Sequence, residues 1–299
     1  MDDAVKARPE DSVLVMYSGG LDSTLLAAML AGKFRRMFLV TYDLPYTVGL
    51  DNCRKNIEKI KKVDPNCEVT HHIIDLAGTR KIFFDDFYAD YFKYCKGGAP
   101  GIICFSCRMA MLIESIKFCL QNGIGHLAVG NTKVQANKAH SFPGIVKRFA
   151  DFMARYGIVY TNPVYGVESR EKEEELLKEF GMDVGKNIGL SSVTNQPRCL
   201  LGIYSTLWLL GNPLVEKDMI EYFEDKVPLM ERYLSEFEPL KGKIKSRQDL
   251  RTPIDETEKG GWVHEFGPLM DRVLSVLLTP LWWLSQIYFR LRSGRGIKK

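Results

Sequence analysis

Short apolar runs alternate with helical patterns along residues 12–202, and this alternation most constrains the fold. The apolar runs are too short for helices and are bounded by turn residues, so they predict buried strands; they cover residues 12–17, 37–43, 69–75, 126–130 and 157–160. Helical patterns lie between them. Strands that alternate with helices favour a parallel sheet that is covered on both faces. We therefore expect an α/β fold with a five-stranded parallel sheet.

The helical patterns divide the chain into two parts. Helices are expected over residues 21–30, 52–63, 83–94, 104–121 and 169–180, and the last of them should end at Gly181, a favourable C-cap. Beyond about residue 210 no strand pattern follows, and residues 214–237 predict one or two helices. We therefore expect a sheet domain at residues 1–205 and a helical C-terminal extension at residues 206–299.

Composition and charge exclude several protein classes. The chain of 299 residues is 45% hydrophobic and 26% charged, which excludes a disordered, collagen-like or disulfide-stapled protein. The net charge of +4 is concentrated in the basic tail Arg290–Lys299, so the nearly neutral body indicates nucleic-acid binding only weakly. Seven cysteines, an odd number, and no signal-peptide pattern predict a reduced, cytoplasmic location.

An apolar segment near the C-terminus allows three interpretations. Residues 273–289 are apolar, carry aromatic side chains beside basic ones, and contain Pro280. Such a segment could pack on the core or on a second subunit of a homodimer, lie on a membrane surface as a peripheral contact, or span a membrane. The first interpretation is favoured because the segment is short for a span and Pro280 would kink it.

The most informative string lies between the first expected strand and the first expected helix. It reads Tyr17-Ser18-Gly19-Gly20-Leu21-Asp22-Ser23. The two glycines let the backbone turn tightly and approach an anion, and the following helix directs its free N–H groups to the same place. The two serines add hydroxyl donors. Asp22 is unusual beside phosphate unless it binds Mg²⁺ or caps the helix, and there is no Walker lysine.

This string resembles the PP-loop of the N-type ATP pyrophosphatases, in the adenine nucleotide α-hydrolase superfamily. The resemblance implies a Rossmann-like sheet, with residues 17–23 holding the β- and γ-phosphates of ATP beside Mg²⁺. It also implies attack at the α-phosphate, which adenylates a substrate and releases pyrophosphate, with Asp22 and Ser23 as catalytic residues. By the same resemblance, Asp43, at the end of the second expected strand, falls where the family's adenosine pocket lies, and Gly130 and Lys133, at and after the end of the fourth, are further expected nucleotide contacts.

The segment after the fourth expected strand differs from the thiolating relatives of this family. Those relatives often carry Gly-His-Asn followed by two acids, whereas this chain reads Gly130-Asn131-Thr132-Lys133-Val134. A second difference is Asn162, which stands where the family's Arg-Pro-Leu has arginine.

Three cysteines form the second informative group. Cys104 and Cys107 make a C-x-x-C at the start of an expected helix, and Cys199 lies at another expected helix start. Thiols at helix N-termini should have lowered pKa values, which suits a metal or a cluster. Cys95 could be a fourth ligand. The other cysteines and the five histidines are expected to be structural, and Arg108 and Lys138 could meet phosphate or be solvated.

A C-x-x-C with one distant cysteine on this fold resembles the iron–sulfur-dependent tRNA thiolation enzymes. The resemblance implies that Cys104, Cys107 and Cys199 hold a [4Fe-4S] cluster whose open iron carries sulfur. Zinc with a fourth ligand, and a persulfide on the C-x-x-C pair, are the alternatives for these thiols.

The expected function is therefore ATP-dependent adenylation of a substrate carbonyl for sulfur insertion. The substrate would be tRNA or a small molecule, and the sulfur would come from a donor protein or from sulfide. Two alternatives stay open: an amide- or nitrile-forming ligase of the same fold with a zinc site, and a non-catalytic ATP-binding subunit attached to a membrane.

Overall fold

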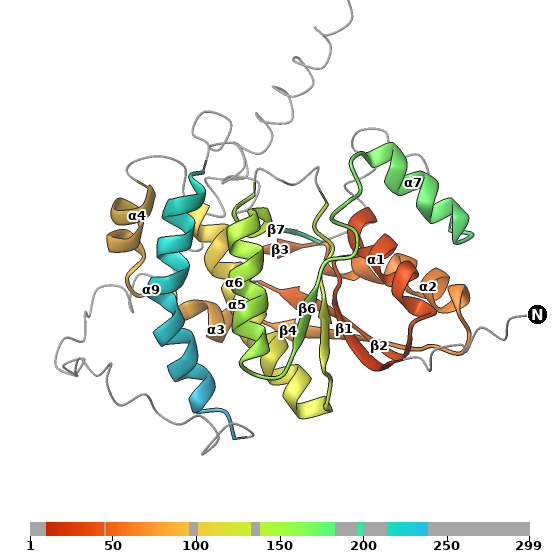
Figure 1. Cartoon of the computed structure of the whole chain (residues 1–299), viewed down its shortest axis with the longest axis horizontal. Coiled ribbons are helices and arrows are strands. Elements are labelled where there is room, and N and C mark those ends of the chain that lie inside the picture. The colour runs from red at the N-terminus through yellow and green to blue at the C-terminus, as the bar shows by residue number, and fades with distance from the viewer. Residues whose placement is uncertain are drawn as a thin grey trace, which may run out of the picture.

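A computed structural model describes residues 10–44, 46–95, 101–132, 138–182, 197–199 and 214–238 (Figure 1). Its centre is a five-stranded sheet of β1 (Glu10–Met16), β2 (Phe34–Asp43), β4 (Glu68–Asp75), β5 (His126–Ala128) and β6 (Val159–Thr161). The strand order is β4-β2-β1-β5-β6, and all neighbouring strands are parallel. The expected α/β fold with a five-stranded, Rossmann-like parallel sheet is confirmed.

Helices cover the sheet, and a small ribbon stands beside it. The α-helices are α1 (Leu21–Ala31), α2 (Ile57–Val63), α3 (Ala77–Lys81), α4 (Phe87–Cys95), α5 (Gly101–Asn122), α6 (Pro143–Ala154), α7 (Arg170–Glu179) and α9 (Glu216–Ser235). The 3₁₀ helices are η1 (Leu50–Asn56) and η3 (Ala139–Ser141). The ribbon pairs β3 (Thr47–Val48) with β7 (Arg198–Cys199) in antiparallel fashion.

Three helical segments differ from the sequence-based expectation. The helix expected over residues 52–63 is divided, because η1 forms its first part and α2 only its second. The helix expected over residues 83–94 begins only at Phe87, and the short α3 precedes it. Helix α6 was not expected, although Pro143 occupies its first turn and its buried side chains recur at helical spacing.

The two faces of the sheet have separate hydrophobic cores. Successive side chains of β1 point alternately into one core and the other. Val13 and Val15 point to the face covered by α1, α2 and α7, whereas Leu14 and Met16 point to the face covered by α5, α6 and α9. The two helix groups lie on opposite sides of the sheet in Figure 1. This arrangement confirms the expectation of a sheet covered on both faces.

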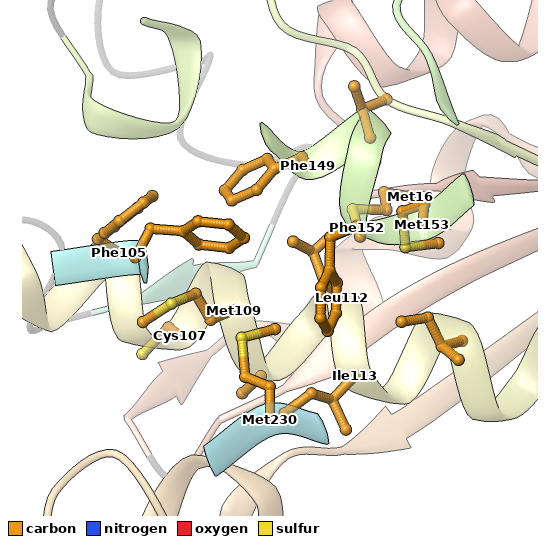
Figure 2. Close-up of a cluster of buried hydrophobic side chains, with 14 of the residues drawn as sticks. Met16, Phe105, Cys107, Met109, Leu112, Ile113, Phe149, Phe152, Met153 and Met230 are labelled. Carbon is orange, nitrogen blue, oxygen red and sulfur yellow. The ribbon is translucent and has the colours of Figure 1, made fainter. Parts of the chain in front are cut away.

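The core beneath α5 is rich in aromatic side chains. Figure 2 shows Phe105 of α5 among Phe149 and Phe152 of α6 and Met230 of α9. The rings of Phe105 and Phe149 are stacked with their centroids 5.8 Å apart. Helix α5 therefore has its position set mainly by apolar packing.

Ion pairs fasten α9 to its neighbours. Arg148 and Arg155 of α6 reach Glu224 and Glu231 of α9, each at 2.6 Å. Lys226 of α9 also lies 2.7 Å from Asp90 of α4, and both side chains are buried. Helix α9 is thus part of the core on this face of the sheet.

The expected boundary between residues 205 and 206 falls outside the described residues, as does the apolar segment at residues 273–289 with the basic tail. In the part of the chain that the structure describes, no helix combines the length and apolar character that crossing a membrane requires.

Candidate active site

The sheet topology creates a crevice at the carboxyl ends of β1 and β5. From β1 the chain continues to β2, which lies on one side of β1, and it later adds β5 on the other side of β1. The strand connections therefore diverge between β1 and β5. A cavity of about 510 Å³ lies there, a volume in the range of small-molecule sites. Its wall includes the loop after β1, the end of β2, the segment after β5, and parts of α5 and β7.

The loop between β1 and α1 is held by its own hydroxyl groups. The Ser23 Oγ accepts from the Ser18 backbone N–H and donates to the Gly20 carbonyl, both at 3.2 Å. The Ser18 Oγ lies 3.2 Å from the Ser23 Oγ and accepts from the Gly20 N–H at 3.3 Å. Gly19 has φ of 76°, a conformation that glycine adopts without strain. The expected tight turn is therefore present.

The N-terminus of α1 faces this loop without a side-chain cap. Gly20 is the N-cap residue and makes no side-chain hydrogen bond, since it has no side chain. The first N–H groups of a helix lack partners within the helix and attract anions. Asp22 lies in the first turn of α1 and not at the N-cap. The alternative in which Asp22 caps this helix is therefore wrong.

Neighbouring elements brace the loop from outside. The Thr41 Oγ1 of β2 donates to the Tyr17 carbonyl at 2.8 Å, and the Asn56 Nδ2 of η1 donates to the Gly19 carbonyl at 3.4 Å. The chain after β5 approaches so closely that a Cβ on Gly130 would lie 3.1 Å from the Asp22 carbonyl carbon and oxygen. The segment after β5 therefore adjoins the loop directly.

An arginine bridges two carboxylates beside the loop. The Arg170 Nη1 lies 3.3 Å from the Asp22 Oδ1 and 3.2 Å from the Glu173 Oε2. Glu173 is 0% exposed, and burial together with the neighbouring Asp22 raises its pKa to about 7. Its Oε1 is buried without a hydrogen-bond partner. Mg²⁺ is often held by one or two carboxylates plus substrate phosphates. Asp22 lines the cavity, whereas Glu173 is fully buried and does not, so Asp22 is the carboxylate of this pair that could meet Mg²⁺ there.

The structure brings most of the expected nucleotide-binding residues to the cavity. Its wall includes Tyr17, Ser18, Gly20, Leu21, Asp22, Ser23 and Gly130. Gly19 forms the turn within the same loop. Asp43 ends β2 and is partly exposed; its neighbours Tyr42 and Leu44 line the cavity, but it does not. Lys133 lies outside the described residues.

Basic side chains line the wall as well, and the sequence indicated only some of them. Arg108, Lys138 and Arg170 line the cavity, as does His140, which was expected to be structural. Burial and the charges of Arg108 and Lys138 lower the pKa of His140 well below its usual value, so this imidazole is neutral. Arg170 and His140 show no motif in the sequence, since only the fold places them beside the loop.

One expectation about the cysteines is wrong, and another is not tested. Cys199 lies on β7, where it pairs with Thr47 of β3, and the helix expected to start there falls on residues outside the described ones. Cys107 is 7% exposed and lies among apolar side chains (Figure 2). Burial raises its pKa to about 12, whereas a lowered value was expected. Cys107 lies past the first turn of α5 and faces the core, so desolvation prevails over any helix-terminus effect.

The three cysteines are neighbours, but they do not form a ligand set as placed. Cys104 and Cys199 are both near enough to Cys107 to raise its pKa through their charges. Cys199 also lines the cavity. Over residues 10–238, wherever the structure describes them, no three His, Cys, Asp or Glu side chains are placed to hold a metal ion. The described arrangement does not by itself make a metal site of these thiols, and a [4Fe-4S] cluster or zinc at them stays a prediction.

Comparison with known proteins gives distant similarity to solved structures. No family model matches the sequence, and no curated protein matches it. Among solved structures, the chain is similar to a protein described as a predicted subunit of tRNA methyltransferase from Methanocaldococcus jannaschii. The identity is 22% and the TM-score 0.39, over 56% of this chain and 76% of that chain. A similarity this distant carries no information on activity.

Proposed function

We propose that the cavity binds ATP and cleaves it between the α- and β-phosphates, so that a substrate oxygen becomes adenylated and pyrophosphate leaves. The observation that carries this proposal is the loop at residues 18–23, which combines the string typical of PP-loop ATP pyrophosphatases with a hydroxyl-braced turn. This loop opens onto the cavity at the point where the strand connections diverge.

The charges around the loop suit this reaction. The uncapped N-terminus of α1 and the Ser18 and Ser23 hydroxyls would bind the β- and γ-phosphates. Asp22, which lines the cavity, would hold Mg²⁺, and Mg²⁺ would neutralise the charge of the departing pyrophosphate. Lys138 lines the cavity close enough to Asp22 for their charges to interact, and it would stabilise negative charge in the transition state.

Sulfur insertion is the second part of the proposal, and the position of Cys199 supports it. Once the substrate carbonyl oxygen carries AMP, a sulfur nucleophile at the sulfide level would attack the carbon, and AMP would leave with that oxygen. Cys199 lines the cavity, so it would place a thiol beside the carbon of a substrate bound there. Free sulfide or a donor protein would supply the sulfur, and the acceptor would be tRNA or a small molecule.

A cluster or zinc at Cys104, Cys107 and Cys199 stays a separate proposal, since the thiols would have to move together to bind either. Iron, zinc and acid-labile sulfide content of protein purified without oxygen would test it, with the variant Cys199→Ala beside the wild type. About four irons and four sulfides per chain, lost in the variant, would support the cluster. Stoichiometric zinc would favour the ligase alternative.

Ligand binding and product analysis test the adenylation proposal. Calorimetry with Mg²⁺ should show binding of ATP and pyrophosphate, and Ser23→Ala should weaken both by about tenfold because a phosphate-facing hydroxyl is lost. Ser235→Ala, at the last residue of α9, is the matched control and should change neither affinity.

The products of ATP turnover decide between the functions. With acceptor present, the enzyme should form AMP and pyrophosphate and should exchange labelled pyrophosphate into ATP. Formation of ADP and phosphate would contradict the proposal. Binding of ATP without exchange, for every acceptor tried, would favour the non-catalytic subunit.

A further inference from the structure

Arg108 has an unusual environment for a cavity arginine. It lies on α5, is partly buried and lines the cavity beside the loop. Its Nη2 makes a long hydrogen bond, 3.5 Å, to the Asn131 Oδ1, and the Tyr160 hydroxyl lies near enough for Arg108 to act on its pKa. The Arg108 Nε is buried without a hydrogen-bond partner. Among the residues that the structure describes, no carboxylate forms an ion pair with it. A guanidinium that is removed from water ordinarily has an anion beside it.

Two further donors beside Arg108 are also unpartnered. Asn131 is 4% exposed and Thr132 is 0% exposed, and both line the cavity. The Asn131 Nδ2 and the Thr132 Oγ1 are buried without hydrogen-bond partners. The backbone of Asn131 is fixed on both sides by Asn162, whose Oδ1 accepts from the Asn131 N–H and whose Nδ2 donates to the Asn131 carbonyl. Buried donors that remain unpaired in a native site point to a ligand that accepts from them.

These donors lie next to the phosphate loop. Asn131 follows Gly130, which approaches the Asp22 backbone so closely that a Cβ would lie 3.1 Å from it. A ligand group held by Arg108 and Asn131 would therefore adjoin a group held by the loop. In ATP, the α-phosphate has this relation to the β-phosphate.

We propose that Arg108, Asn131 and Thr132 form a second anion subsite, which holds the α-phosphate of ATP and the phosphate of AMP. The inference rests on the proposed function and assigns the adenylate side of the reaction to residues that the loop does not include. The loop would hold the pyrophosphate half of ATP. The planar guanidinium can donate two parallel hydrogen bonds to one phosphate, which suits the reacting phosphoryl group.

The test separates the two halves of ATP. Calorimetry on the full chain measures AMP, adenosine and pyrophosphate binding, with Mg²⁺ present. Arg108→Gln should weaken AMP by at least about tenfold, because charge-assisted hydrogen bonds are lost, and should leave adenosine and pyrophosphate within about twofold. Ser23→Ala should do the reverse, weakening pyrophosphate more than AMP.

Matched variants separate the loss of the subsite from general effects of charge and folding on AMP affinity. Arg36→Gln removes the same charge from an exposed position on β2 and should change none of the three affinities. Arg108→Lys keeps the charge without the planar fork and should bind AMP between the wild type and Arg108→Gln. If thermal unfolding shows that Arg108→Gln does not fold, Asn131→Ala and Thr132→Val take its place with the same expectation for AMP.

The outcomes distinguish the inference from the proposed function. A wild type that binds neither ATP nor pyrophosphate overturns the proposed function. If the wild type binds ATP and pyrophosphate, the proposed function stands. The inference alone is then overturned if Arg108→Gln binds AMP as tightly as the wild type, or if it loses affinity for AMP, adenosine and pyrophosphate equally.

Discussion

The phosphate loop and the group of three thiols (Cys104, Cys107 and Cys199) differ in the range of the contacts that shape them. Within the loop, hydroxyl and backbone groups of residues 18–23 bond to one another. Among the thiols, Cys107 comes from α5 and faces the core, and Cys199 comes from the β3–β7 ribbon and lines the cavity, so their approach depends on contacts between distant segments. The loop is thus preformed by local chemistry, whereas the group of thiols depends on how whole elements pack.

This difference has a consequence for mutation. A change in the core under α5 should act on the stability of the whole protein, because this helix is held by apolar packing. A change at the loop should act mainly on ligand binding or on a few local hydrogen bonds. The following variants test that contrast, from the largest expected effect to the smallest.

Phe105→Ala should destabilise the protein by about 3–5 kcal/mol, since it deletes a fully buried ring and leaves a cavity. Phe105 stands between the two C-x-x-C cysteines, is 0% exposed and packs against the rings of Phe149 and Tyr222. Chemical denaturation measures the effect. Phe92→Ala is the control, because Phe92 is 69% exposed and its loss should cost far less. Equal costs for the two variants would show that the core under α5 does not have this role.

Gly130→Ala should destabilise the protein by about 1–3 kcal/mol and weaken ATP binding, because the new methyl group meets the Asp22 backbone. Gly125→Ala is the matched control at the other end of β5, where a Cβ meets nothing within 4 Å. Thermal unfolding and calorimetry measure both quantities. An alanine at residue 130 that leaves both unchanged would argue against the close approach of β5 to the loop.

The buried Glu173 should make stability depend on pH. Its folded-state pKa is about 7, above the ordinary 4.5, so the folded protein holds this proton more tightly than the unfolded chain does. The stabilisation is complete below about pH 4.5 and is lost as the pH rises towards 7. The unfolding free energy should therefore fall by at most about 1.4 kcal/mol per pH unit in this window.

Denaturation at several pH values in Mg²⁺-free buffer measures this slope. Glu173→Gln should remove the contribution, and Glu174→Gln, on the same helix, should keep it. A slope that survives Glu173→Gln would assign the pH dependence to another group.

Ser169→Ala should have the smallest effect, about 1 kcal/mol, because it removes the N-cap of α7. The Ser169 Oγ accepts from the Lys172 N–H at 3.2 Å. Since α7 carries Arg170, which lines the cavity, the variant should also weaken ATP binding slightly. Thermal unfolding is the measurement, and Ser235→Ala is the control at the end of another helix. A loss above about 3 kcal/mol would mean that the hydroxyl does more than cap.

Elements with strong local signals could be predicted from the sequence. The strands of the central sheet were predicted from short apolar runs. The end of α7 was predicted from Gly181, and the structure has a φ of 71° there. The helix was expected to include Ser169, which the structure instead makes its N-cap. Helix α6 could have been predicted as well, since Pro143 and the spacing of its buried residues were visible.

Other features had no local signal. The position of Arg108 beside Asn131 joins α5 to the segment after β5, and no spacing in the sequence encodes that contact. The raised pKa of Cys107 arises because α5 turns that side chain towards the core, whereas the C-x-x-C spacing suggested an accessible thiol. His140 reached the cavity for the same reason, through the placement of its element.

The sequence by itself determined the order of strands and helices and the phosphate loop, because hydrophobic periodicity, glycine and hydroxyl groups act over a few residues. The tertiary structure alone decided which charged side chains face that loop and which thiols are buried. Those properties depend on solvent exclusion and on contacts between distant segments, and both arise only when the helices pack on the sheet.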